Sequence, residues 1–112
     1  MGMYDVSDNE MQFAIITRAT SGELIATPGA DQRLVIYGWL LCTVAAADVK
    51  WQHASTDFNS VAIPMGAAEK WLMDIGKKPH LVCSLNEALN INLSTPVQLA
   101  GWIQYQLSRK TT

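Results

Sequence analysis

Polar and apolar side chains alternate almost residue by residue over residues 87–107, EALNINLSTPVQLAGWIQYQL. A period of two is the pattern of a β-strand with one buried face, whereas an amphipathic helix repeats its apolar residues every three to four positions. The alternation therefore predicts two strands, over residues 88–94 and 97–108, joined by a short Ser-Thr-Pro turn. The side chains expected to point inward are Leu89, Ile91, Leu93, Val97, Leu99, Gly101, Ile103, Tyr105 and Leu107.

The rest of the chain consists of short apolar segments separated by turn residues, and no long segment holds a helical period. Further strands are expected at 11–17, 23–28, 33–44, 45–55, 61–65, 69–75 and 80–85, although 69–75 also fits a helical turn. Segment 33–44 is apolar on both faces, which predicts a strand covered on both sides. Gly38 in its middle suggests a bulge or a close backbone approach. The pattern predicts an all-β protein, an antiparallel, jelly-roll-like β-sandwich of about eight or nine short strands.

A chain of 112 residues is expected to form one domain. We divide it into a polar N-terminal arm (1–12), the sandwich (13–108) and a C-terminal tail (109–112). Charged residues make up only 16% of the chain, against roughly 25% in a typical soluble domain. Few charges are thus available to cover the outside, which favours a surface partly covered by copies of the chain or by partners.

Charge and hydropathy argue against several partners. The net charge is −2, and the eight Lys and Arg are spread along the chain, so we expect no nucleic-acid binding. No segment has the apolar length of a membrane span, and the first residues lack the regions of a signal peptide. We therefore expect no membrane partner, and a protein made in a cytoplasm or assembled there into something larger.

The residue types of catalysis and metal binding do not form a recognisable motif. Two histidines, His53 and His80, and two cysteines, Cys42 and Cys83, show no close ligand spacing. Phosphate-binding glycine loops and a nucleophile elbow are absent from the sequence. The carboxylates fall mostly in turns or on polar strand faces, where solvation or turn formation explains them. We therefore expect no enzyme activity, no cofactor and no metal, with both cysteines buried as small hydrophobic residues.

Four tryptophans in a chain of this size suggest either subunit contact or a sugar-stacking platform. Trp102 falls on the same side of its predicted strand as Gln98, Gln104 and Gln106, away from the apolar row. An exposed Trp between glutamines indicates a contact face. Packing within the domain and ligand binding remain alternatives for this side chain.

Part of the sequence resembles a group of short β-sandwich virion proteins of tailed bacteriophages. The similarity covers roughly residues 24–107, and the closing motif is its most specific part. Asn86 stands where Gly is common in the pattern, and Asn tolerates the left-handed backbone that such a turn needs. The Trp and Met residues of 65–73 also depart from the pattern. The matching residues are Gly29, Arg33, Val35, Val49, Trp51, Ile63, Pro64, Met65, Glu87, Ala88, Leu89, Ile91, Leu93, Ser94, Val97, Gly101 and Tyr105.

The resemblance implies a structural virion protein without an active site, most simply a capsid decoration (cement) protein that binds between major capsid subunits and stabilises the shell. It also implies a homo-oligomer, commonly a trimer, located in the virion after assembly in the host cytoplasm. On this basis Trp102, Gln104, Gln106 and Tyr37 are predicted subunit contacts, and Met3, Tyr4 and Met11 of the arm are predicted to dock on the capsid. The alternative is a tail-fibre, neck or spike module that binds carbohydrate or a host receptor.

Overall fold

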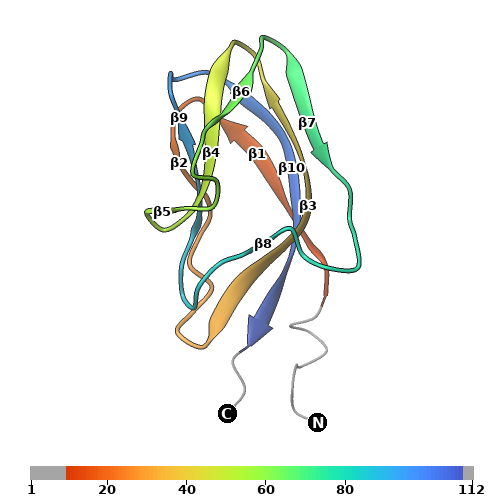
Figure 1. Cartoon of the computed structure of the whole chain (residues 1–112). Coiled ribbons are helices and arrows are strands. Elements are labelled where there is room, and N and C mark those ends of the chain that lie inside the picture. Colours follow the sequence, from red (N-terminus) through yellow and green to blue (C-terminus); the bar gives the residue numbers. More distant parts are fainter. Residues whose placement is uncertain (1–9, 110–112) are drawn as a thin grey trace.

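The computed structural model describes residues 10–109, which form ten strands and no helix, so no helix of this part could cross a membrane (Figure 1). All strand pairs are antiparallel. The strands are β1 (Gln12–Arg18), β2 (Gly22–Ile25), β3 (Gln32–Thr43), β4 (Ala47–His53), β5 (Thr56–Asp57), β6 (Ile63–Met65), β7 (Glu69–Met73), β8 (Leu81–Val82), β9 (Leu89–Leu93) and β10 (Leu99–Arg109).

The strands are divided between two sheets that pack face to face. Sheet A has the order β1-β10-β3-β7, with β8 also paired to β3, and sheet B has the order β2-β9-β4-β5, with β6 also paired to β4. The first four strands alternate between the sheets, and the first and last strands are neighbours in sheet A. This confirms the predicted jelly-roll-like sandwich. The prediction missed β5, a two-residue strand within a segment interpreted as a turn.

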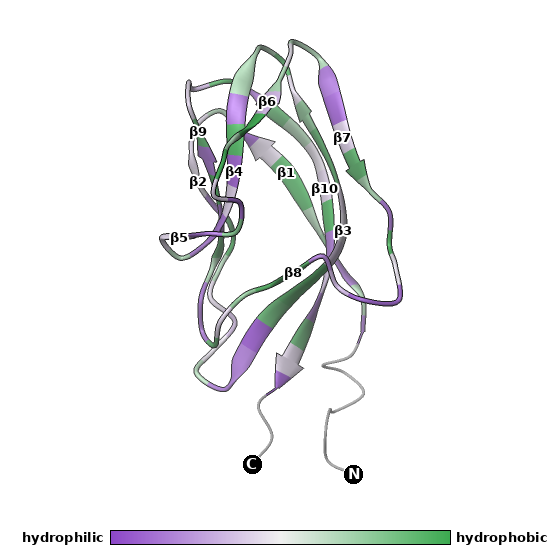
Figure 2. Ribbon diagram, in the orientation of Figure 1, coloured by the Kyte–Doolittle hydropathy of each residue, from purple (hydrophilic) through white to green (hydrophobic). Residues whose placement is uncertain are grey.

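The core lies between the sheets, and the closing strands contribute to it as their alternation predicts. In β9, Leu89, Ile91 and Leu93 are buried while Asn92 is exposed. In β10 the inward row includes Leu99 and Ile103, both fully buried. Figure 2 shows hydrophobic residues distributed along strands of both sheets. The two-residue period therefore identified the buried face of both strands.

The inner and outer faces of β3 change places at a β-bulge. Gly38 lies opposite Gln104 of β10, but Ile36 lies opposite the next residue, Tyr105, so Tyr37 is the extra residue. The inward row changes from Leu34 and Ile36 to Trp39, Leu41 and Thr43, all of which are buried.

The expectation that β3 is covered on both sides holds at Val35 and Gly38, which are buried on its outer face, but not farther along the strand. Because the inward row shifts by one residue, Leu40 and Cys42 lie on the outer face, where both are partly exposed. Gly38 meets both of its predictions: it adjoins the bulge, and a Cβ there would lie 2.8 Å from the carbonyl oxygen of Met73. The chain that follows β7 thus passes close to the outer side of β3 at this point.

The structure also shows the conformation of segment 69–75 and of the turn at Asn86. Within segment 69–75, residues Glu69–Met73 form the strand β7, with Trp71 packed against the core and Leu72 facing outward. Asn86 adopts the left-handed conformation, with a φ of 55°, which Asn tolerates better than most residues.

Candidate subunit-contact face

A row of apolar residues crosses the outer face of sheet A. Ile15 of β1 lies opposite Trp102 of β10, Trp102 lies opposite Leu40 of β3, and Leu40 lies opposite Leu72 of β7. Side chains in directly opposite positions are near enough to touch, so the four form a continuous stripe. Ile15 is 71% exposed and Leu72 is 54% exposed, while Trp102 and Leu40 are partly exposed.

Phe13 widens this stripe on the β1 side. Phe13 is 63% exposed, and its ring meets the Trp102 ring edge-on, with centroids 6.2 Å apart and an interplanar angle of 65°. We call the five residues Phe13, Ile15, Leu40, Leu72 and Trp102 the outer apolar face. A continuous group of large apolar side chains, exposed on β1 and β7 and partly exposed on β10 and β3, is typical of a protein-protein contact.

Trp102 is the one predicted contact residue that belongs to this face. Gln104, another predicted contact residue, is only 9% exposed and offers little surface to another subunit. It lies opposite Gly38, where the chain after β7 passes close to the sheet. Gln106 is partly exposed opposite Val35, and Tyr37 is partly exposed at the bulge.

Sequence reasoning missed Phe13, Ile15, Leu40 and Leu72. The signal in β1 was present, since MQFAIIT is apolar at both alternating positions and only one set can face the core. For the predicted capsid-docking residues, Met11 is 37% exposed just before β1. Met3 and Tyr4 lie outside the described residues.

The tryptophans do not form a stacking platform on one surface. Trp39 and Trp51 are buried at 2% and 1% exposure, with ring centroids 4.9 Å apart, and Trp71 packs edge-on against Trp39. These three rings fill the interior of the sandwich, so Trp102 is the tryptophan that reaches the outer face. The feature that motivated the carbohydrate-binding alternative is therefore explained by core packing.

The two cysteines have different environments. Cys83 is 1% exposed in the core, and burial, with a smaller contribution from the charge of Glu87, raises the pKa of its thiol to about 12. Such a thiol is a small core hydrophobe and not a nucleophile at neutral pH. The prediction of burial is wrong for Cys42, which is partly exposed on the outer face of sheet A.

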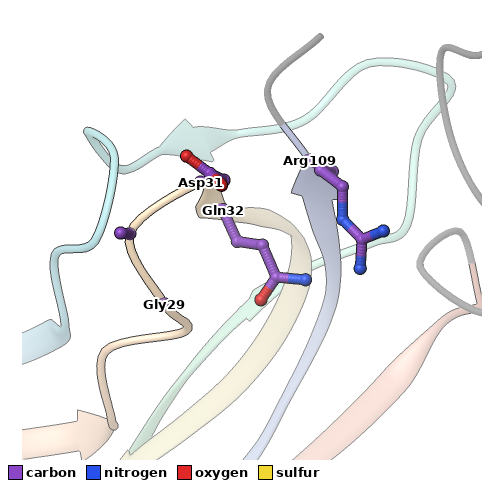
Figure 3. Close-up of a pocket in the computed structure, with 5 residues that line it drawn as sticks. Gly29, Asp31, Gln32 and Arg109 are labelled. Carbon is purple, nitrogen blue, oxygen red and sulfur yellow. The ribbon is translucent and has the colours of Figure 1, made fainter.

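A shallow pocket of about 340 Å³ lies where the loop before β3 meets the end of β10 (Figure 3). Its lining includes one carboxylate, Asp31, and one guanidinium, Arg109, with Gln32 between them in the picture. This set lacks the two carboxyl groups in a shared cleft that acid–base chemistry on a sugar requires. Within residues 10–109, no three His, Cys, Asp or Glu side chains gather as metal ligands.

The outer apolar face is thus the feature of the described surface that most clearly indicates a partner. No protein-family model, curated protein or solved structure matches the chain.

Proposed function

We propose that this protein is a structural component of a tailed-phage particle, a capsid decoration protein that binds the assembled shell and stabilises it. The observation that carries the proposal is the outer apolar face, which lies on a small jelly-roll sandwich of low charge content. The similarity of the closing motif to virion proteins supplies the type of particle. No catalytic residue is assigned.

Burial of the outer apolar face is the driving force of the proposed binding. Each large apolar side chain that leaves water contributes about 1.5–3 kcal/mol. A protein that binds the assembled shell more tightly than its dissociated subunits shifts the equilibrium toward the shell. Stabilisation of the capsid then follows from binding alone.

The test uses capsids of the encoding phage from which this protein has been removed. Co-sedimentation should show saturable binding, and the capsid melting temperature should rise with bound protein. Binding should also slow the alkylation of the Cys42 thiol by a soluble reagent, because Cys42 lies on the outer face two residues along β3 from Leu40. Capsids that neither retain the protein nor melt at a higher temperature would contradict the proposal.

A matched pair of variants tests the face itself. Leu72→Lys places an ammonium group on the outer apolar face, and we expect at least about tenfold weaker capsid binding, since a buried unpaired charge is costly. Val61→Lys is the control, because Val61 is 75% exposed but lies outside sheet A. Equal binding by the two variants would exclude the outer apolar face as the contact.

A further inference from the structure

Within residues 10–109, three of the four sheet edges carry features that prevent pairing with another chain. In sheet A, β7 bears Glu69 and Lys70, and β8 has only two residues. In sheet B, β2 is short, bears Glu23 and has an irregular register. At the opposite edge, β5 has two residues and β6 contains Pro64. Short strands, charges, proline and bulges are the usual protections of an edge.

The remaining edge, β1, has none of these protections. It is seven residues long, its only charge is its last residue, Arg18, and it contains neither proline nor glycine. Its register with β10 is unbroken from Gln12 to Arg18, and among the described strands it pairs with β10 alone. Phe13 and Ile15 add apolar side chains to this edge. Such an edge is suited to receive another strand.

We propose that β1 pairs antiparallel with β1 of a second copy across a two-fold axis, which joins the two copies of sheet A into one continuous sheet. A two-fold contact needs a surface that complements itself. A register centred on Ala14 satisfies this condition, because Phe13 of each copy then lies opposite Ile15 of the other. The same register brings Glu10 opposite Arg18, whereas parallel pairing would place each Arg18 beside its equivalent.

The pairing also extends the outer apolar face. Because Ile15 ends the row on β1, two paired copies place their rows end to end across the shared edge. Arg18 lies at the end of the paired segment, where its guanidinium already donates hydrogen bonds to the carbonyl oxygens of Thr20, Ser21 and Glu23. The acidic Glu10 of the other copy would meet this positive group.

The inference goes beyond the proposed function, because the pairing needs no capsid. Light scattering during gel filtration should give a mass twice the 12.3 kDa of the chain. Ile15→Lys should shift this mass to that of a monomer, because it places a charge on each side of the axis. The matched control is Val61→Lys, since Val61 is 75% exposed, like Ile15 at 71%, but lies outside sheet A; it should remain a dimer.

Unchanged circular dichroism and a cooperative urea transition should show that Ile15→Lys is folded, and its midpoint, unlike that of the wild-type dimer, should not depend on protein concentration. A wild-type monomer, a trimer such as the resemblance implies, or a dimer that survives Ile15→Lys would overturn the pairing. A wild-type protein that is monomeric but still binds and stabilises capsids would overturn the pairing and leave the proposed function intact. A wild-type dimer that does not bind capsids would support the pairing and contradict the proposed function.

Cross-linking tests the register. In the proposed register Ala14 of one copy lies opposite Ala14 of the other, so Ala14→Cys should form a disulfide-linked dimer under mild oxidation. Val61→Cys should not. Failure of Ala14→Cys to cross-link in a folded dimer would overturn the register centred on Ala14.

Discussion

At the scale of single residues, Gly101 shows how a backbone position selects its amino acid. It has a φ of 136°, and a Cβ built on it would lie 1.8 Å from the carbonyl oxygen of Leu40 in the neighbouring strand. Since the obstacle is backbone, no side-chain rotation can relieve the overlap. We expect Gly101→Ala to lower the free energy of unfolding by more than about 3 kcal/mol, the upper range of ordinary overpacking, as measured by urea denaturation.

Gly66 provides the control for this substitution. A Cβ added to Gly66 would meet no heavy atom within 4 Å, and its φ does not lie in the left-handed region. Gly66→Ala should therefore change the urea midpoint little. Similar losses for both variants would mean that the contact with Leu40 does not explain the glycine at position 101.

At the scale of secondary-structure elements, Asn59 ties the segment after β5 to β4. Its Oδ1 accepts a hydrogen bond from the Trp51 backbone N–H at 2.9 Å, and its Nδ2 donates to the carbonyl oxygens of Val49 and Val61 at 3.2 and 2.9 Å. Asn59→Ala removes these partners and should cost about 1–3 kcal/mol of stability. Asn92→Ala is the control, because Asn92 is exposed on the outer side of β9. Equal urea midpoints for the two variants would contradict the role assigned to Asn59.

Strands β9 and β10 could be predicted from the sequence because each keeps one alternation from end to end. Strand β3 could not, because Tyr37 inserts one residue and moves the buried row from even to odd positions. The apolar residues on both faces of β3 suggested that both faces are covered, but one of these residues, Leu40, belongs to the outer apolar face. The contribution of β1 was missed for a related reason, since apolar residues alone do not reveal which side meets the core. Trp102 was found because a Trp among glutamines breaks the pattern.

At the scale of the whole molecule, the fold closes by pairing its first strand with its last. The thiol of Cys83 is buried in the core between the two sheets that this closure holds together. Burial raises the pKa of this thiol in the folded protein to about 12, from a reference value of 9.0. Above pH 9 the unfolded chain therefore loses a proton that the folded chain keeps.

Because the folded chain binds more protons than the unfolded chain in this range, Cys83 should make the sandwich less stable as the pH rises from about 9 to about 12. The contribution is at most about 1.4 kcal/mol per pH unit, and it should be absent below pH 8, where the thiol is protonated in both states. Urea denaturation at several pH values should give a steeper loss of stability for the wild type than for Cys83→Ala. Because the other titrating groups are common to both proteins, the difference between the slopes isolates the thiol. Parallel slopes would show that the thiol reaches solvent in the folded protein, and would contradict the closed core from which the prediction is drawn.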